Sequence, residues 1–257
     1  MITIQLLGGH GNQLFQWAFG MAQAKRLGVK LQLNTSKLGG NRPYTLNQWT
    51  AEKSDVPYQV EPTVREQGMP YNPALANSIK NGDVIQGYWQ TEKYFQGIEQ
   101  ELLALRPRVT SNALLENIFN TMQPVAVHVR RGDYTREPHA SFHGNLGLDY
   151  YNNAFNYIIE RIPRPTFFIF SDDPQWCREH FTSEGRRSVV IVEPTEEASD
   201  IQAMSLCKHN IIANSSFSWW GAYLGKRGDR VVVAPKNWFQ SKDEDSRDIV
   251  PERWVRI

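Results

Sequence analysis

Two adjacent arginines, Arg130 and Arg131, are the residues whose type and setting point most clearly to chemistry. They lie in the segment 128–134, HVRRGDY, at the end of an apolar run that predicts a buried strand. A cation there is costly to hold without an anionic partner, and the planar guanidinium suits a diphosphate. Because side chains alternate along a strand, we expect different roles. For Arg130 we favour an anionic ligand over a structural ion pair. For Arg131 both alternatives stay open, and the partner in an ion pair would be, for instance, Asp133.

A pair of carboxylates follows the next strand-like run, residues 166–170. Asp172 and Asp173 come after Ser171 and before Pro174. A carboxylate in this place could accept hydrogen bonds from a guanine edge or a ribose. An adjacent acidic pair is also a ligand set for Mg²⁺, and Ser171 or Asp172 could cap the helix that follows. The residue types leave these three alternatives open.

A third polar segment, residues 214–223 with the sequence NSSFSWWGAY, lies between a predicted strand and a predicted helix. Small polar side chains there cap the helix or, with its free amides, bind an anion. The aromatic residues suit sugar binding, because they combine an apolar face with a polar edge. We nevertheless expect at least one tryptophan of the Trp219-Trp220 pair to pack the helix.

A glycine turn, residues 8–13 with the sequence GGHGNQ, follows the first predicted strand. Glycines there let backbone amides approach an anion at a helix N-terminus, so a structural turn and a phosphate loop are both open. A dinucleotide fingerprint needs a third glycine where Leu14 stands and an acidic residue about 20 positions later, where the sequence has Leu33 and Asn34. These departures argue against a dinucleotide-dependent oxidoreductase.

Apolar runs alternate with helical patterns in two series, which predicts an α/β protein with parallel sheets. We predict one Rossmann-like domain over residues 1–110, a second over 122–240, and a tail over 241–257 that could return to the first. Ligands of such sheets bind beyond the carboxyl ends of the strands. All four polar segments are predicted to lie at those ends.

Composition narrows the function classes. The formal net charge is +1 and no long basic run occurs, which argues against nucleic-acid binding by a general charge field. Two cysteines, Cys177 and Cys207, do not make a disulfide framework. The sequence shows no secretory signal pattern and no apolar stretch of membrane-spanning length. We therefore expect a cytoplasmic protein, with peripheral contact to the inner face of the membrane left open.

With these segments taken together and in this order, the chain resembles the α-1,2-fucosyltransferase family. The family motifs are similar to residues 8–13, 128–134, 171–173 and 214–222. The resemblance implies a GT-B-type fold of two facing Rossmann-like domains, with GDP-fucose held mainly by the C-terminal domain and the acceptor on the N-terminal side. It also implies inversion at the fucose carbon, no metal, a contact of Arg130 with the donor diphosphate, and contacts of His128 and Asp173 with guanine.

We accordingly predict transfer of L-fucose from GDP-β-L-fucose to the 2-hydroxyl of a galactose in an oligosaccharide or lipid-linked glycan, without a cofactor. Arg130 would stabilise the diphosphate and Asp133 would be the general base, with His139, His143 and Asp149 as alternatives. The alternatives in function are a non-catalytic nucleotide-sugar or glycan binding protein and a fucosyltransferase of other regiochemistry. The predicted substrate-binding residues are Gly9, Asn12, Gln13, His128, Arg131, Ser171, Asp172, Asp173, Asn214, Ser215, Ser216, Ser218 and Trp219.

Overall fold

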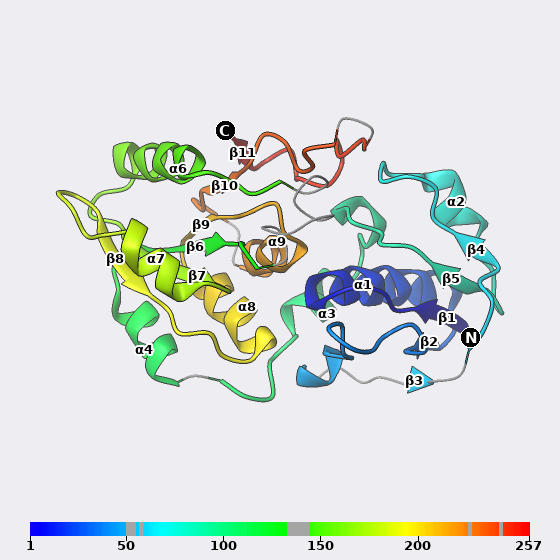
Figure 1. The fold of residues 1–257 in the computed structure, drawn as a ribbon. Coiled ribbons are helices and arrows are strands. Elements are labelled where there is room, and N and C mark those ends of the chain that lie inside the picture. The colour runs from blue at the N-terminus through cyan, green and yellow to red at the C-terminus, as the bar shows by residue number, and fades with distance from the viewer. Residues whose placement is uncertain (50–54, 57–58, 111, 133–143, 226–227, 242–243) are drawn as a thin grey trace. The chain divides into compact units, whose positions relative to one another are not determined.

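The protein is divided into two compact α/β units, each built on its own parallel sheet (Figure 1). The first comprises residues 1–108 and 244–251, and the second residues 109–243 and 252–257. The computed structural model describes the chain except for residues 50–54, 57–58, 111, 133–143, 226–227 and 242–243. Each unit is described by itself.

The N-terminal sheet has five parallel strands in the order β3-β2-β1-β5-β4. The strand order reverses between β1 and β5, and the glycine turn 8–13 follows β1 there. The elements of this unit are β1 (Ile2–Gln5), α1 (His10–Leu27), β2 (Leu31–Asn34), η1 (Leu46–Gln48), β3 (Asp55–Val56), β4 (Val64–Arg65), α2 (Pro73–Ser78), β5 (Val84–Gln86), η2 (Glu92–Tyr94) and α3 (Glu99–Leu103).

Helix α1 packs closely on the first two strands because Gly20 has no side chain. A Cβ on Gly20 would lie 2.6 Å from a methylene carbon of Ile4 and 2.8 Å from a methyl carbon of Leu31. The helix ends at Gly28, which adopts a left-handed conformation (φ 64°) that glycine accepts without strain. The first strand and helix are thus where the apolar pattern predicts them.

The C-terminal sheet has six parallel strands in the order β11-β10-β9-β6-β7-β8. The order reverses between β6 and β9, which is the topological switch point of this doubly wound sheet. The elements are α4 (Asn112–Asn120), β6 (Pro124–Val129), α6 (Leu148–Arg161), β7 (Thr166–Ser171), α7 (Pro174–His180), β8 (Ser188–Ile191), α8 (Glu197–Leu206), β9 (His209–Ile211), α9 (Ser216–Tyr223), β10 (Val232–Ala234) and β11 (Val255–Arg256).

Both faces of the C-terminal sheet are covered, which explains the continuous apolar runs of its strands. Val125, Val127 and Val129 of β6 pack in one core cluster with residues of α6 and α7. On the other face of the same strand, α8 contacts β6, and the ring of His128 lies against Phe217 of α9. Successive side chains of β6 therefore face opposite sides of the sheet, which is the alternation predicted for residues 128–131.

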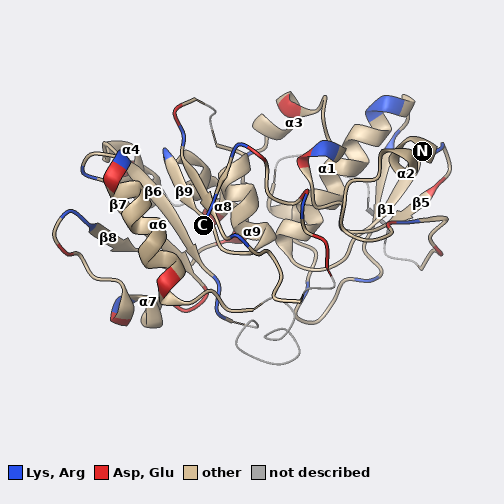
Figure 2. Cartoon of the chain, turned by 90° about the horizontal axis from the view of Figure 1, so that it is seen from above, with Lys and Arg blue, Asp and Glu red and all other residues tan. Residues whose placement is uncertain are grey.

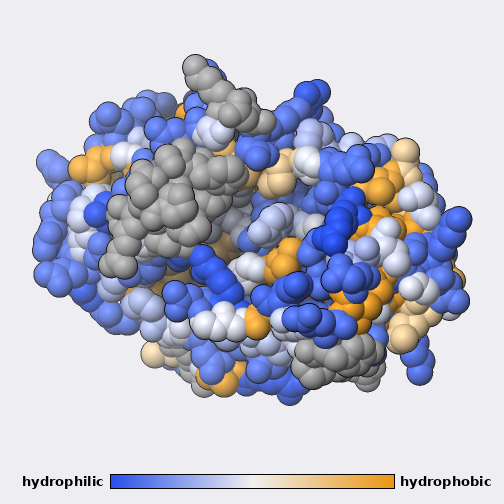
Figure 3. Space-filling model, turned by 45° about the vertical axis from the view of Figure 1, so that its right-hand side comes forward, coloured by the Kyte–Doolittle hydropathy of each residue, from blue (hydrophilic) through white to orange (hydrophobic). Residues whose placement is uncertain are grey.

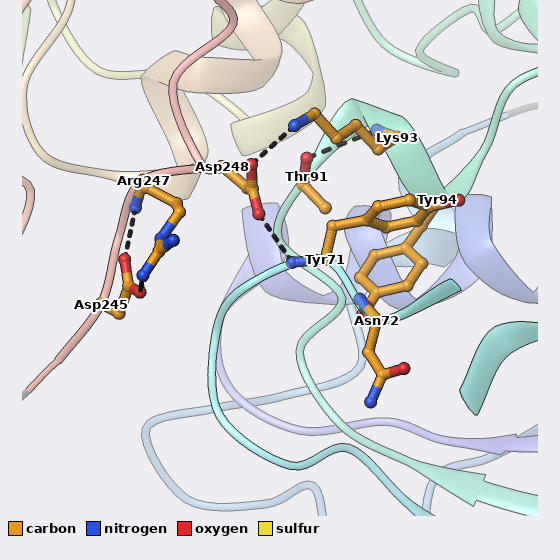
Figure 4. A network of polar contacts seen from close by, with 8 residues as sticks. All are labelled: Tyr71, Asn72, Thr91, Lys93, Tyr94, Asp245, Arg247 and Asp248. Atoms are coloured by element: carbon orange, nitrogen blue, oxygen red, sulfur yellow. Dashed lines mark hydrogen bonds and ion pairs between the residues drawn. The ribbon is translucent and has the colours of Figure 1, made fainter. Parts of the chain in front are cut away.

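The C-terminal tail is shared between the two units. Residues 244–251 belong to the first unit, where Asp248 accepts hydrogen bonds from the Tyr71 amide (2.8 Å) and from Lys93 Nζ (2.6 Å) (Figure 4). Beyond them, β11 pairs with β10 and Trp254 contacts Trp219. The last residues of the tail thus extend the C-terminal sheet, a strand that the sequence did not indicate.

Two regions differ from the sequence-based expectation. The pattern of residues 91–105, with Thr91 as a candidate N-cap and Pro107 beyond the end, predicts a single helix. The structure instead has η2 and α3 there, because the chain turns at Gly97 (φ 89°). The region 34–82, which shows weak periodicity, contains the short strands β3 and β4 and the helix α2. Asn72 caps α2 by accepting a hydrogen bond from the Leu75 amide (3.0 Å).

The surface in Figure 3 is mostly hydrophilic, with apolar residues gathered in separate patches. Among the helices that the structure describes, none is long and apolar enough to cross a bilayer.

Glu66 is an ionisable residue enclosed at the carboxyl end of the N-terminal sheet. Its Oε2 accepts hydrogen bonds from the amides of Tyr88 (2.6 Å) and Trp89 (3.0 Å), whereas the buried Oε1 has no partner among the described residues. Burial raises the pKa of Glu66 from 4.5 to about 7, although the two amides oppose the shift. The folded protein therefore binds a proton at Glu66 between pH 4.5 and 7 that the unfolded chain releases.

We expect Glu66 to make the protein less stable as the pH rises through this window, because a raised carboxyl pKa stabilises the fold only at low pH. Glu66→Gln should remove this dependence. Its free energy of unfolding relative to the original protein should rise by up to about 3 kcal/mol between pH 4.5 and 8. Urea denaturation across that range measures the effect. Glu61→Gln, at a 92% exposed side chain, is the control, and parallel pH profiles for all three proteins would contradict the prediction.

Candidate functional site

The candidate site lies at the carboxyl edge of the C-terminal sheet, on both sides of its switch point. The segment 128–132 ends β6, residues 171–173 end the neighbouring β7, and residues 214–218 follow β9 and begin α9. All three strands are parallel, so their carboxyl ends meet at one edge. Three sequence segments that are far apart in the chain are thereby brought together.

The register of β6 and β7 pairs the two arginines with the two aspartates. Val129 lies opposite Ser171, so the next residues of the two strands continue side by side. Arg130 Nη1 lies 2.8 Å from Asp172 Oδ2, and Arg131 Nε lies 3.1 Å from Asp173 Oδ2. The side chains of Arg130 and Asp172 remain 26% and 27% exposed, so the pair is accessible to a ligand.

The two arginines point in different directions, as the strand alternation predicts. Arg131 leans on α7, where its guanidinium carbon lies 4.0 Å from the ring centroid of Trp176. Its ion pair is with Asp173, which also caps α7 by accepting a hydrogen bond from the Trp176 amide (3.1 Å). Arg131 thus has the structural ion pair that the sequence left open, and Asp173 has the capping role expected for Ser171 or Asp172.

Gly132 permits the close approach of these groups. A Cβ at this position would lie 2.5 Å from Asp172 Oδ2, which is closer than real contacts allow. The other oxygen of Asp172 accepts a hydrogen bond from the Arg131 amide (2.9 Å). Asp172 is therefore fixed by backbone and side chain together, and it orients Arg130 in turn.

His128 is a buried, neutral imidazole beside this ion pair. The residue is 5% exposed, and its ring centroid lies 5.4 Å from that of Phe217. Burial lowers the pKa of His128 to about 3, with a further lowering by Arg130 and an opposing effect of Asp172. Its Nδ1 is buried and has no hydrogen-bond partner among the described residues. A buried polar atom without a partner is unusual.

The serines of the third segment have mainly structural contacts. Ser215 caps α9 by accepting a hydrogen bond from the Phe217 amide (3.3 Å), and Ser171 similarly accepts one from the Asp173 amide (3.0 Å). Ser218 is fully buried, and its hydroxyl donates to carbonyls of the same segment. Among the serines predicted at this segment, Ser216 is the one that is neither buried nor the helix cap.

Two further predicted substrate contacts, Trp219 and Asn214, lie in the core. Trp219 is 0% exposed and stacks on Tyr223 with ring centroids 4.5 Å apart. Asn214 is 2% exposed, and its amide donates to the carbonyls of Trp238 (3.2 Å) and Gly144 (3.3 Å). Both side chains are thus buried in the structure, and their contact with a substrate stays a prediction.

The glycine turn 8–13 forms a helix start in the N-terminal unit. Gly9 is the N-cap of α1, and Asn12 accepts a hydrogen bond from Gln90 Nε2 (2.7 Å). Gln13 is fully buried and binds the backbone of Gly8, Pro43 and Thr45, so it shapes the turn and presents no surface for substrate. Gly9 and Asn12 are partly exposed and stay predicted ligand contacts.

The candidate bases are placed unequally. Asp133, His139 and His143 lie outside the described residues. Asp149 lies in the first turn of α6 and is exposed. Within the described part of the chain, no three His, Cys, Asp or Glu side chains gather as a metal ion requires.

Two residues that support the site were not predicted from the sequence. Trp176 packs under Arg131, and the hydroxyl of Tyr151 donates to the His128 carbonyl (3.2 Å) at the end of β6. Trp176 stands three residues after Asp173, which is the spacing between a helix cap and the amide that donates to it. The sequence thus contained a local signal that links Trp176 to Asp173. Tyr151 comes from a helix far along the chain, and no local pattern links it to β6.

Comparison with known proteins shows what this chain is similar to. Residues 75–257 match the family model described as glycosyl transferase family 11. The α-1,2-colitosyltransferase of Escherichia coli is 32% identical over 289 residues, covering 100% of this chain and 99% of that protein. Galactoside 2-α-L-fucosyltransferase SEC1 of Bos taurus is 34% identical over 141 residues, which is 52% of this chain and 38% of that protein.

Among solved structures, the NodZ α-1,6-fucosyltransferase soaked with GDP-fucose has a TM-score of 0.52 at 14% identity, over 87% of this chain and 92% of that one. At this identity the likeness concerns the fold alone. It confirms the predicted α/β fold of the GT-B type.

We expect Asp173→Ala to destabilise the protein by about 1–2 kcal/mol, because it removes the cap of α7 and the partner of Arg131. Asp173→Asn keeps a capping oxygen and loses only a partly exposed ion pair, so its cost should stay below about 1 kcal/mol. Urea denaturation measures both. Gln175→Ala, in the same helical turn, is the control. Equal losses in the two Asp173 variants would show that the cap is not the main contribution.

Proposed function

The chain belongs to glycosyl transferase family 11, and we propose that it transfers L-fucose from GDP-β-L-fucose to the 2-hydroxyl of a galactose residue, with inversion. The motif 128–134 and the similarity to a galactoside 2-α-L-fucosyltransferase support this proposal. The observation that carries it is the partly exposed Arg130–Asp172 pair at the switch point of the C-terminal sheet.

The proposed role of Arg130 follows from the charge that develops during transfer. As the bond between the fucose carbon and the diphosphate breaks, negative charge accumulates on the leaving GDP. A fixed donor aimed at that charge lowers the barrier, because it needs no reorganisation during the reaction. Asp172 orients Arg130 through Nη1, and a guanidinium presents its N–H donors in a planar fork that suits a diphosphate. In this proposal, Arg130 binds the diphosphate.

Guanine would be held next to Arg130 by His128 and Asp173. The imidazole of His128 is neutral at physiological pH because burial lowers its pKa to about 3, so each ring nitrogen has one defined role. In this proposal its Nδ1, which has no partner among the described residues, bonds a polar edge of the base. Each carboxylate oxygen of Asp173 accepts one hydrogen bond already and retains capacity for a second.

Inversion by direct displacement also requires that a proton leaves the acceptor hydroxyl, and we propose Asp133 as the base. It follows Gly132 directly and is thus close in sequence to the groups proposed to hold the diphosphate. We also propose that the reaction needs no cofactor and no metal ion. The proposed acceptor is a galactose-terminated oligosaccharide or lipid-linked glycan.

A second donor is suggested by the colitosyltransferase similarity, which covers the whole chain. Colitose is L-fucose without the 3-hydroxyl. A site that hydrogen-bonds this hydroxyl discriminates strongly against the deoxy sugar, whereas one that leaves it unbound accepts both. The two donors therefore have to be compared directly.

We expect the protein to release GDP from GDP-fucose in the presence of EDTA, faster when lactose is added, and to form an α-1,2 linkage visible by NMR. The same assay with GDP-colitose shows which donor has the higher kcat/KM. Tight binding of GDP-fucose without turnover on lactose would limit the failure to the acceptor. If neither nucleotide sugar binds, the proposed donor site is wrong.

Arg130→Lys should reduce kcat by about 100- to 1000-fold, because one ammonium charge cannot replace a guanidinium that binds Asp172 and diphosphate together. Steady-state kinetics measures this loss. Arg178→Lys, at an exposed arginine of the same unit that pairs with Glu193, is the control and should stay near the original rate. Activity of Arg130→Lys within tenfold of the original would exclude the proposed role.

Asp133→Asn should lose transfer while calorimetry shows unchanged GDP-fucose binding.

A further inference from the structure

The amino edge of the C-terminal sheet, at the opposite end of the strands from the candidate site, combines exposed apolar and cationic residues. Its strands begin side by side, since Pro124 pairs with Thr166, Thr166 with Ser188, and Val125 with His209. We call the following residues around these strand starts the amino-edge surface: Phe119, Met122, Arg164, Arg186, Leu206 and Lys208.

The apolar members are exposed to a degree that is unusual for large side chains. Phe119 is 89% exposed, Met122 65% and Leu206 50%. Phe119 lies in the last turn of α4, Met122 follows that helix, and Leu206 ends α8. The two helices contact each other, and Lys208 Nζ donates to the Met122 carbonyl (2.7 Å). Apolar side chains gathered on one surface indicate an interaction site, whereas single ones do not.

The cationic members have no carboxylate partner. Arg164 and Arg186 form no ion pair with any described residue, and Lys208 bonds a carbonyl. The acidic neighbours Glu160 and Glu184 are each paired with another arginine, Arg161 and Arg187. In Figure 2 blue and red segments both occur at the left-hand end of the C-terminal unit. This edge therefore presents cations, Arg164 and Arg186, that pair with no carboxylate in the described part of the chain.

A hollow lies beside these cations. It has a volume of about 550 Å³ and is lined by residues 164–166 and 183–188, which include Arg164, Arg186 and Arg187. Arg164 and Arg186 line this open hollow and suit a phosphate group, because a guanidinium offers paired N–H donors. Glu184, which also lines it, is paired with Arg187. The amide of Thr166 donates to the Gln123 carbonyl (3.0 Å), so this hollow adjoins the segment that carries Met122.

Arg164 is held in a conformation that its sequence disfavours. Its φ is 51°, in the left-handed region, although it is not glycine and stands before Pro165, which restricts the preceding residue to extended conformations. Strain of this kind persists where the surroundings impose it and is found at ligand contacts. Here it occurs at a residue that lines the hollow and has no ion pair with any described residue.

We propose that the amino-edge surface docks on a bilayer rich in anionic phospholipid, with phosphate groups in the hollow and the apolar side chains in the interface. Exposed aromatic and aliphatic residues beside unpaired Arg and Lys are the combination that binds such surfaces, and free phosphate would not account for the apolar half. The six-residue strand β6 separates this edge from the candidate site by about 20 Å. Docking in this way leaves that site open to a glycan.

The test is flotation of the full chain with two kinds of vesicle. We expect binding to phosphatidylcholine vesicles containing about 30 mol % phosphatidylglycerol and little binding to phosphatidylcholine alone. The triple variant Arg164→Gln/Arg186→Gln/Lys208→Gln should weaken binding on the order of 100-fold, about fivefold for each charge. Phe119→Ser/Met122→Ser should weaken it about tenfold. Transfer to a free oligosaccharide should change less than about twofold in both variants, since neither touches the candidate site.

Matched controls separate this surface from a general charge effect. Lys30→Gln/Lys37→Gln/Lys80→Gln removes the same charge from exposed positions of the N-terminal unit, and Leu103→Ser removes a 55% exposed apolar residue there. Both should bind the anionic vesicles like the original protein. Equal loss in the two triple variants would overturn the proposal, as would absence of binding to anionic vesicles. Because flotation needs no donor sugar, its outcome is independent of the transfer assay.

Discussion

The parallel pairing of β6 with β7 is the constraint on which the candidate site depends. One register, Val129 opposite Ser171, places two arginines against two aspartates and makes a double ion pair at the sheet edge. A shift by one residue would exchange the faces on which these side chains lie. Such partly exposed pairs add little stability, about 1 kcal/mol or less each. Their importance is that they fix where the guanidinium groups point.

The rest of the C-terminal unit maintains this register by burying both faces of the sheet. Valines of β6 pack with α6 and α7 on one face, and the opposite face is covered by α8 and α9. Arg230 ties the latter two helices together, because its guanidinium donates to the carbonyls of Ser205 (3.2 Å) and Gly221 (3.5 Å) near their C-terminal ends. Burial lowers the pKa of Arg230 to about 10, but the cation persists at physiological pH and faces the negative ends of both helix dipoles.

The C-terminal sheet has different surfaces at the two ends of its strands. The carboxyl edge carries ion-paired arginines and the buried His128, a setting suited to a small anionic ligand. The amino edge carries unpaired arginines and exposed apolar side chains, a setting suited to an extended surface. In a doubly wound sheet the two edges are independent, because the helices between them cover the faces. One sheet can therefore support a proposed donor site and a proposed docking surface without overlap.

Local sequence patterns determined the elements and the family. The apolar periodicity indicated β1, α1 and the alternation of strands and helices after residue 124, and motif 128–134 indicated the chemistry. What only the tertiary structure decided is which residues of these motifs are exposed and which are buried. Gln13, Asn214, Ser218 and Trp219 belong to the motifs but are buried in the fold, and Arg131 pairs with Asp173, 42 residues away. The physical reason is that helix and strand preferences act between near neighbours in the chain, whereas burial and ion pairing depend on strand register, which brings distant segments together.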